Sequence, residues 1–159
     1  MTLAYVALGS NLGDPRQQVL DAIDALAALP GSRLLRRSPL YRTPPWGVLE
    51  QPHFVNAVAA LQTTRAPDEL LDALLEIEQR AGRVRSLRNG PRTLDLDLLH
   101  VEGVQWHDER LTLPHPRLAE RAFVLLPLAD IAPALHLPGL GTVAELLARV
   151  DRAGCERLP

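Results

Sequence analysis

The chain has 159 residues, 47% of them hydrophobic, and a formal net charge of −2 at pH 7. These values predict one globular domain over residues 1–159, and they give no general attraction to nucleic acid or to anionic membranes. All 17 basic residues are arginine, which excludes a lysine Schiff base and a Walker-type phosphate lysine.

Cysteine use and the N-terminal composition predict a cytoplasmic protein. Cys155 is the only cysteine in the sequence, so no intramolecular disulfide is possible. The sequence does not open with a basic segment followed by an apolar run, and no apolar stretch approaches the length of a membrane span. A reducing compartment is the simplest account of these features.

The first forty residues predict a strand, a helix and a second strand. The apolar run Leu3–Leu8 is typical of a buried strand, and a tight loop follows over Gly9–Asp14. Asp14 and Pro15 favour the start of a helix that Pro30-Gly31 would end. The residues Ser32–Leu40 are then expected to form the second strand.

A proline-rich segment and a third strand come next. The stretch Tyr41–Pro52 holds three prolines and a glycine, so we expect an irregular loop outside any sheet. It forms either the wall of a small-molecule pocket or a rigid surface turn. In the expected strand His53–Leu61, Asn56 shares an apolar face with Phe54. A buried carboxamide there needs partners, either from the backbone or from the polar edge of a heterocycle.

An arginine-rich segment follows the second predicted helix. That helix begins at Pro67 and ends near Gly82, and five arginines then lie between residues 80 and 92. Such a run is ordinarily a solvated surface. Because this one leads directly into a pair of carboxylates, we expect a mobile loop that closes over a polyphosphate.

The stretch from Leu94 to Leu98 alternates leucine with aspartate, which is the period of a half-buried strand. Asp95 and Asp97 would project from one face with their side-chain roots about 7 Å apart. Paired carboxylates suit Mg²⁺, which takes one or two of them together with substrate phosphates. The alternative is an edge strand whose acids pair with arginines and discourage aggregation.

The remaining third of the chain predicts a hairpin, a polar loop and two helices. Glu102-Gly103 is typical of a turn, with a return strand over Val104–Trp106. The Arg110–Pro116 stretch mixes hydrogen-bond donors with prolines. A helical region over Arg117–Asp130 and a last helix over Val143–Ala153, capped by Thr142, complete the chain.

These motifs, taken in order, resemble those of the 6-hydroxymethyl-7,8-dihydropterin pyrophosphokinase family of folate biosynthesis. The resemblance covers nearly the whole chain. It is carried by Gly9-Ser10-Asn11-Leu12, Tyr41-Arg42-Thr43-Pro44-Pro45, Gln51-Pro52, Asn56, Gly82-Arg83, Gly90-Pro91-Arg92-Thr93-Leu94-Asp95-Leu96-Asp97, and Arg110-Leu111-Thr112 with Pro114-His115.

The resemblance implies an α+β fold, a single-domain αβα sandwich whose ferredoxin-like antiparallel sheet is flanked by helices. It implies transfer of the terminal diphosphate of ATP to the hydroxymethyl group of the pterin, with release of AMP. ATP is then a co-substrate and two Mg²⁺ ions are cofactors. We expect a monomer that binds small molecules only, and neither nucleic acid nor membrane.

The resemblance also implies a role for particular residues. The metal ligands would be Asp95 and Asp97, with Asp95 nearest to the attacking hydroxyl, and the phosphates would be reached by Arg83 and Arg92. The nucleotide would be held by Glu78, Arg85, Arg110, Thr112, His115 and Arg121. The pterin would stack between Phe54 and Phe123, with its polar edge read by Asn56 and by the backbone around Thr43, Pro45 and Trp46.

Two other functions remain open on the residues alone. A Mg²⁺-dependent phosphodiesterase or nuclease could use the same aspartate pair, but we would expect it to have an open basic groove. A non-catalytic ferredoxin-like module could bind a small ligand, but it would not explain five arginines leading into two metal-type carboxylates.

Overall fold

The computed structural model describes residues 1–45, 51–82 and 94–159. Within these ranges six strands form one antiparallel sheet in the order β10–β3–β4–β1–β5, with β2 paired to the same edge of β4 as β3. The bounds are β1 Thr2–Ser10, β2 Ser32–Arg37, β3 Tyr41–Thr43, β4 Phe54–Thr63, β5 Asp95–Val101 and β10 Glu156–Arg157.

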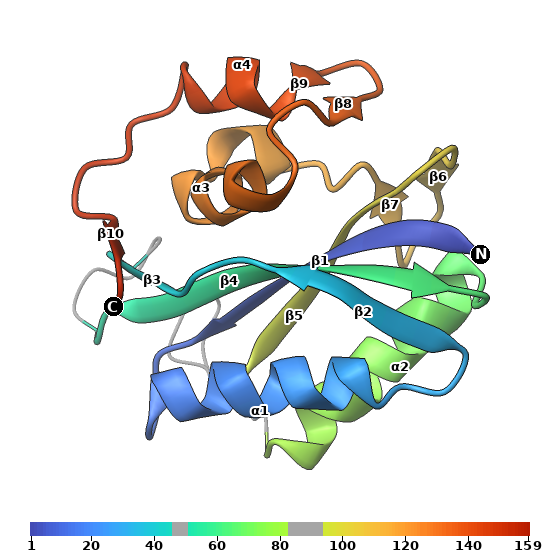
Figure 1. Cartoon of the computed structure of the whole chain (residues 1–159), viewed down its shortest axis with the longest axis horizontal. Coiled ribbons are helices and arrows are strands. Elements are labelled where there is room, and N and C mark those ends of the chain that lie inside the picture. The colour runs from blue at the N-terminus through green and yellow to red at the C-terminus, as the bar shows by residue number, and fades with distance from the viewer. Residues whose placement is uncertain (46–50, 83–93) are drawn as a thin grey trace.

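Helices cover both faces of this sheet (Figure 1). The helices α1 (Pro15–Ala27) and α2 (Pro67–Arg80) lie on one face, and α3 (Ala122–Ile131) lies on the other, with α4 (Val143–Leu147) packed beyond it. A short 3-10 turn, η1 (Leu118–Glu120), precedes α3. The α+β sandwich with a ferredoxin-like antiparallel sheet is therefore confirmed. Among the described residues, no helix is both long enough and apolar enough to span a membrane.

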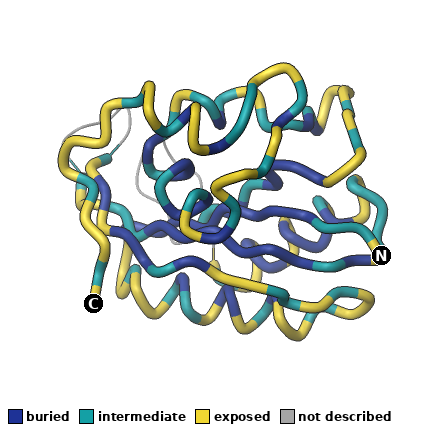
Figure 2. The backbone as a smooth tube through the Cα atoms, turned by 45° about the horizontal axis from the view of Figure 1, so that its top comes forward, coloured by how far each residue is buried: buried dark blue, intermediate teal, exposed yellow. Residues whose placement is uncertain are grey.

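The sheet separates two hydrophobic cores, and residues of its central strands contribute to both. Most residues of these strands are buried (Figure 2). Alternation along β4 decides which side chain enters which core, because successive side chains of a strand point to opposite faces. Ala57, Ala59 and Leu61 pack in the core under α1 and α2. Val58 and Ala60 pack in the core under α3. The two faces predicted for this strand are confirmed.

The first helix begins as its sequence predicts. The Asp14 side chain accepts a hydrogen bond from the Gln17 backbone N–H at 3.2 Å, and Pro15 occupies the first turn. The prediction for Tyr41–Pro52 is wrong at its start, because Tyr41–Thr43 pairs with β4 as strand β3. The prolines begin only at residue 44, so they end this strand without preventing it.

The C-terminal third differs from its prediction in two places. The expected return strand of the hairpin pairs elsewhere: β6 (Trp106–His107) joins β7 (Thr112–Leu113). A second small ribbon joins β8 (His136–Leu137) to β9 (Gly141–Thr142). The last helix has its predicted cap at Thr142 but ends at Leu147. The chain beyond it runs back to the large sheet as β10.

Candidate functional site

Strand β5 places Asp95 and Asp97 on the sheet face that α3 covers. Leu94, Leu96 and Leu98 all belong to the opposite core, under α1 and α2, so the alternating aspartates face the other way. Both aspartates are partly exposed. The predicted placement of two carboxylates on one face of a strand is confirmed. Among the described residues no group of three or more His, Cys, Asp or Glu side chains could hold a metal ion.

The buried carboxylate of Glu78, near the end of α2, fixes the strand between those two acids. Its Oε2 accepts a hydrogen bond from the Leu96 backbone N–H at 2.7 Å, and Glu78 is only 3% exposed. Strand β5 ends the sheet order, so its outward backbone donors need partners from outside the ladder. Glu78 therefore fixes the backbone of Leu96, the residue between Asp95 and Asp97.

Arg121 joins the carboxylates to an aromatic ring. Its Nη1 lies 3.6 Å from Oδ2 of Asp97, and its guanidinium carbon lies 5.5 Å from the centroid of the Phe123 ring. The Arg121 side chain is 15% exposed and that of Asp97 34%. Within the described part of the chain, the buried Nε–H of Arg121 has no hydrogen-bond partner. That donor is available to a ligand.

His115 is a neutral donor beside the same carboxylates. Its backbone N–H donates to the Leu99 carbonyl at 2.8 Å, and its Nδ1 accepts from the Arg117 backbone N–H at 3.2 Å. Burial, then the charges of Arg121 and Arg117, lower the pKa of His115 from 6.5 to about 4, and Asp95 opposes this effect. At pH 7 the imidazole is neutral, and the bond to Nδ1 assigns the proton to Nε2.

A cavity of about 250 Å³ opens beside Asp97 and His115. Leu71 from α2 and Leu98 from β5 contribute apolar walls, while Arg110 and Thr112 contribute polar groups. Its full lining is Leu71, Leu96, Asp97, Leu98, Asp108, Glu109, Arg110, Leu111, Thr112, His115 and Pro116. The predicted nucleotide ligands Arg110, Thr112 and His115 are thus brought together.

The loop that carries Arg110 is built around Asp108. Its carboxylate accepts from the backbone N–H groups of Arg110 at 2.8 Å and Leu111 at 2.9 Å, and from the Trp106 indole at 2.8 Å. These bonds lower the pKa of Asp108, the indole bond most of all. The Arg110 guanidinium pairs with Asp72 of α2 at 2.5 Å. The loop therefore holds a cation at the mouth of the cavity.

A larger cavity, of about 510 Å³, lies between the end of β3 and the start of α3. Thr43 and Pro45 line it from the first side and Phe123 from the second. On the neighbouring strand β4, Asn56 donates from Nδ2 to the Thr43 hydroxyl at 2.6 Å, and Phe54 lies opposite Thr43 in the ladder. Most of the described residues predicted for the pterin, namely Thr43, Pro45, Phe54, Asn56 and Phe123, therefore lie near the end of β3, the start of β4 and the start of α3.

Gly9 explains how the Asn56 carboxamide fits against β1. A Cβ atom on Gly9 would lie 2.6 Å from Oδ1 of Asn56, closer than real Cβ contacts allow. Gly9 therefore lets the carboxamide lie directly over the strand. The sequence left backbone groups and the polar edge of a heterocycle as alternative partners for Asn56. The structure gives its Nδ2 a third kind of partner, the side-chain hydroxyl of Thr43.

Several predicted site residues cannot be placed, and the hydrogen bonds of one buried residue after β1 were not predicted. Trp46, Arg83, Arg85 and Arg92 lie outside the described residues, as does most of the arginine-rich loop. The buried side chain of Asn11, a residue of the Gly9–Leu12 motif for which no role was predicted, donates to Gln51 Oε1 at 2.9 Å and to the Pro52 carbonyl at 3.0 Å. The sequence feature that could have identified Asn11 is its place as a polar residue directly after an apolar strand.

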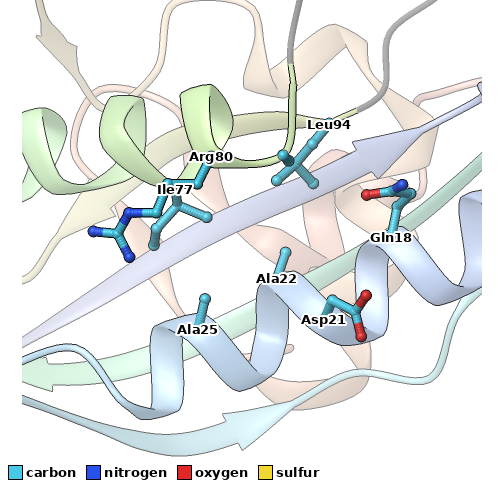
Figure 3. Close-up of a pocket in the computed structure, with 8 residues that line it drawn as sticks. Gln18, Asp21, Ala22, Ala25, Ile77, Arg80 and Leu94 are labelled. Carbon is cyan, nitrogen blue, oxygen red and sulfur yellow. The ribbon is translucent and has the colours of Figure 1, made fainter.

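A third cavity, of about 370 Å³, lies between α1 and α2 (Figure 3). Ala22 and Ala25 of α1 face Ile77 and Arg80 of α2 across it, and Leu94 closes one end. These residues lie on the face of the sheet opposite Asp95 and Asp97. We therefore assign this cavity no part in the candidate site.

Comparison with known proteins identifies the family. A family model described as 7,8-dihydro-6-hydroxymethylpterin-pyrophosphokinase (HPPK) matches residues 5–133. A protein of Methylorubrum extorquens, named 2-amino-4-hydroxy-6-hydroxymethyldihydropteridine pyrophosphokinase, is 52% identical over 158 residues, which cover 99% of each chain. A Pseudomonas aeruginosa protein of the same name is 56% identical over 156 residues, covering 98% of this chain and 96% of the relative.

Solved structures share the fold. The Plasmodium falciparum HPPK-DHPS protein, wild type with pteroate, superposes with a TM-score of 0.75 at 15% identity. The superposition covers 93% of this chain and 42% of that chain, so this chain spans less than half the length of the solved protein. At this identity the likeness shows the fold alone.

Proposed function

The chain belongs to the 7,8-dihydro-6-hydroxymethylpterin-pyrophosphokinase family, and we propose that it catalyses the corresponding diphosphate transfer in folate biosynthesis. In this reaction the hydroxyl oxygen of 6-hydroxymethyl-7,8-dihydropterin attacks the β-phosphorus of ATP. The bond from that phosphorus to the oxygen bridging to the α-phosphorus breaks, and AMP leaves. The hydroxyl loses its proton, and the product is the pterin diphosphate.

One observation carries this proposal: the two cavities lie on either side of the ion pair between Arg121 and Asp97. The smaller cavity includes Asp97 and His115, and the larger includes Phe123. Arg121 joins them, because its guanidinium is 3.6 Å from Asp97 and 5.5 Å from the Phe123 ring. This arrangement suits a donor and an acceptor that meet at a phosphate.

The smaller cavity fits ATP. Leucines from α2 and β5 would pack on the adenine base, while Arg110 and Thr112 would bind the ribose or phosphates. His115 would donate from Nε2 to a phosphate oxygen, as a neutral imidazole does without a change of charge. By family resemblance, Arg83, Arg85 and Arg92 would complete the phosphate contacts.

Asp95 and Asp97 fit Mg²⁺, because two partly exposed carboxylates on one strand face can each bind a hard cation that keeps waters and phosphate ligands. We propose that they hold two Mg²⁺ ions. Bound there, the ions would neutralise phosphate charge and orient the reacting groups. Glu78 would keep the two carboxylates in register, and Asp95 would accept the hydroxyl proton.

The larger cavity and the adjoining residues of β4 fit the pterin. Phe54 and Phe123 would stack on the ring, each contact contributing about 0.5–1.5 kcal/mol beyond area burial. Asn56 and Thr43 would read its polar edge. A substrate lacking that edge would leave buried polar groups unpaired, so Asn56 would contribute more to specificity than stacking does.

We propose that residues 1–159 work as one domain and as a monomer in the cytoplasm, where ATP is abundant. In this proposal the partners of the protein are its small-molecule substrates.

The test is a product assay with ATP, Mg²⁺ and the hydroxymethyl pterin, which should release AMP in a one-to-one ratio with pterin diphosphate. Release of ADP or inorganic phosphate would overturn the proposal, and hydrolysis without pterin would favour the phosphodiesterase. An Asp97→Asn variant should lose turnover. An Asp24→Asn variant, altered at an exposed residue of α1, should keep it.

A further inference from the structure

The C-terminal segment contributes heavily to the larger cavity, although it lies beyond the family-model match. That match ends at residue 133. Five of the twelve residues that line the cavity come from beyond it, and the other seven come from the Thr43–Pro45 and η1–α3 sides. The five are Arg149, Val150, Asp151, Ala153 and Cys155. The cavity therefore has three walls, and the third is C-terminal.

Backbone pairing attaches this segment to the wall that carries Thr43. Strand β10 pairs with β3, with Glu156 opposite Arg42 and Arg157 opposite Tyr41. The Leu158 backbone N–H then donates to the Leu40 carbonyl at 2.8 Å. The C-terminal wall and the Thr43 wall are thus adjacent strands of one sheet.

Side chains attach the same segment to α3. Nη2 of Arg157 lies 2.9 Å from Oδ1 of Asp130, and the Tyr41 hydroxyl donates to the other oxygen of that carboxylate at 2.5 Å. The Arg157 guanidinium also lies 5.9 Å from the Tyr41 ring centroid. One carboxylate on α3 therefore binds groups from β3 and from β10. This cluster joins the three elements that lead into the three walls.

We propose that residues 149–155 form a wall of the pterin subsite and that Arg157 is a positioning residue for it. Through Asp130 and Tyr41, Arg157 holds the C-terminal wall, Thr43 and Phe123 at fixed separations. The inference rests on the proposed function, because it assigns the pterin to this cavity. It adds a determinant of pterin affinity that lies outside the matched family region.

Cys155 allows a direct test, because it is the only cysteine in the chain and lines this wall. The rate of its alkylation by N-ethylmaleimide is measured with α,β-methylene ATP and Mg²⁺, with and without the hydroxymethyl pterin. This analogue is not cleaved at the α–β bond, so the pterin stays bound. The pterin should slow alkylation several-fold beyond the analogue alone. An unchanged rate at saturating pterin, in an enzyme that releases AMP in the standard assay, would overturn the inference while leaving the function intact.

Substitution of Arg157 tests its positioning role. Arg157→Ala should raise the KM for pterin about fivefold, which is the size of effect expected when a partly exposed ion pair is lost. The kcat and the KM for ATP should stay unchanged. Arg157→Lys should restore most of the affinity. Arg33→Ala, which alters an exposed arginine of β2 that lines neither cavity, should behave as wild type. An unchanged pterin KM in Arg157→Ala would refute the positioning role. The role would also be refuted if the affinities for pterin and ATP and the kcat all fell by a similar factor while the Tm was lowered.

Discussion

Acidification should destabilise the protein through His115, and the pKa of this residue allows the effect to be calculated. The native pKa is about 4, against 6.5 for the ordinary value. Between those values the unfolded chain binds a proton that the native protein does not, so stability is complete above pH 6.5 and is lost as the pH falls. The full difference is about 3.4 kcal/mol, and about 2 kcal/mol of it is lost between pH 7 and pH 5.

The assay is urea unfolding at pH 7, 6 and 5 for wild type and for His115→Gln. Other groups that titrate contribute to both proteins, so the informative quantity is the difference between their losses. We expect wild type to lose about 2 kcal/mol more than His115→Gln between pH 7 and pH 5. His136→Gln, which alters an exposed histidine of β8, should keep the wild-type loss. Equal losses in wild type and His115→Gln would refute the reasoning.

Three further predictions concern the carboxylates and the pterin edge. Asp97→Ala should abolish turnover while changing the free energy of unfolding by less than about 1 kcal/mol, because its 3.6 Å ion pair is partly exposed; near-wild-type turnover would place the metal elsewhere. Glu78→Ala should cost about 2 kcal/mol of stability in urea unfolding, because the Leu96 N–H loses its acceptor. It should also raise the Mg²⁺ concentration for half-maximal activity. Glu78→Gln keeps an acceptor and should retain most activity. Gly9→Ala should raise the KM for pterin about tenfold by displacing the Asn56 carboxamide. Steady-state kinetics of the double variant with Asn56→Ala should then show no additional loss, and additive losses would contradict this route.

Local patterns were sufficient to predict most of the helices and strands and the position of the acids, whereas the layered fold was predicted from the family resemblance. The leucine–aspartate alternation of β5 has a period of two residues, so it determines the face of each side chain without knowledge of any neighbour. The Asp14 and Thr142 caps are equally local, because each acts within its own first helical turn. The two faces of β4 follow from the same reasoning.

Contacts between distant segments could not be predicted in this way. The pairing of Tyr41 with Arg157 joins residues 116 positions apart, and a two-residue strand carries no periodic signal. The bond from Glu78 to Leu96 depends on how α2 packs beside β5, which no local pattern specifies. Asn56 was recognised as a polar residue needing a partner, but its partner Thr43 lay in a segment expected to remain outside the sheet. The site was therefore predicted as a set of residues, without the contacts that orient them.

The division of the interior by the sheet has a practical consequence for engineering. Val19, Leu26 and Leu70 fill the compartment under α1 and α2, whereas Arg121 and Phe123 begin the helix that covers the other compartment. Repacking the part of this compartment that lies beneath α1 should change thermal stability without altering a residue that lines the smaller or the larger cavity of the site. A more heat-stable variant for ligand screening is therefore best sought around Val19 and Leu26, and not at Leu71, Leu96 or Leu98, which also line the smaller cavity.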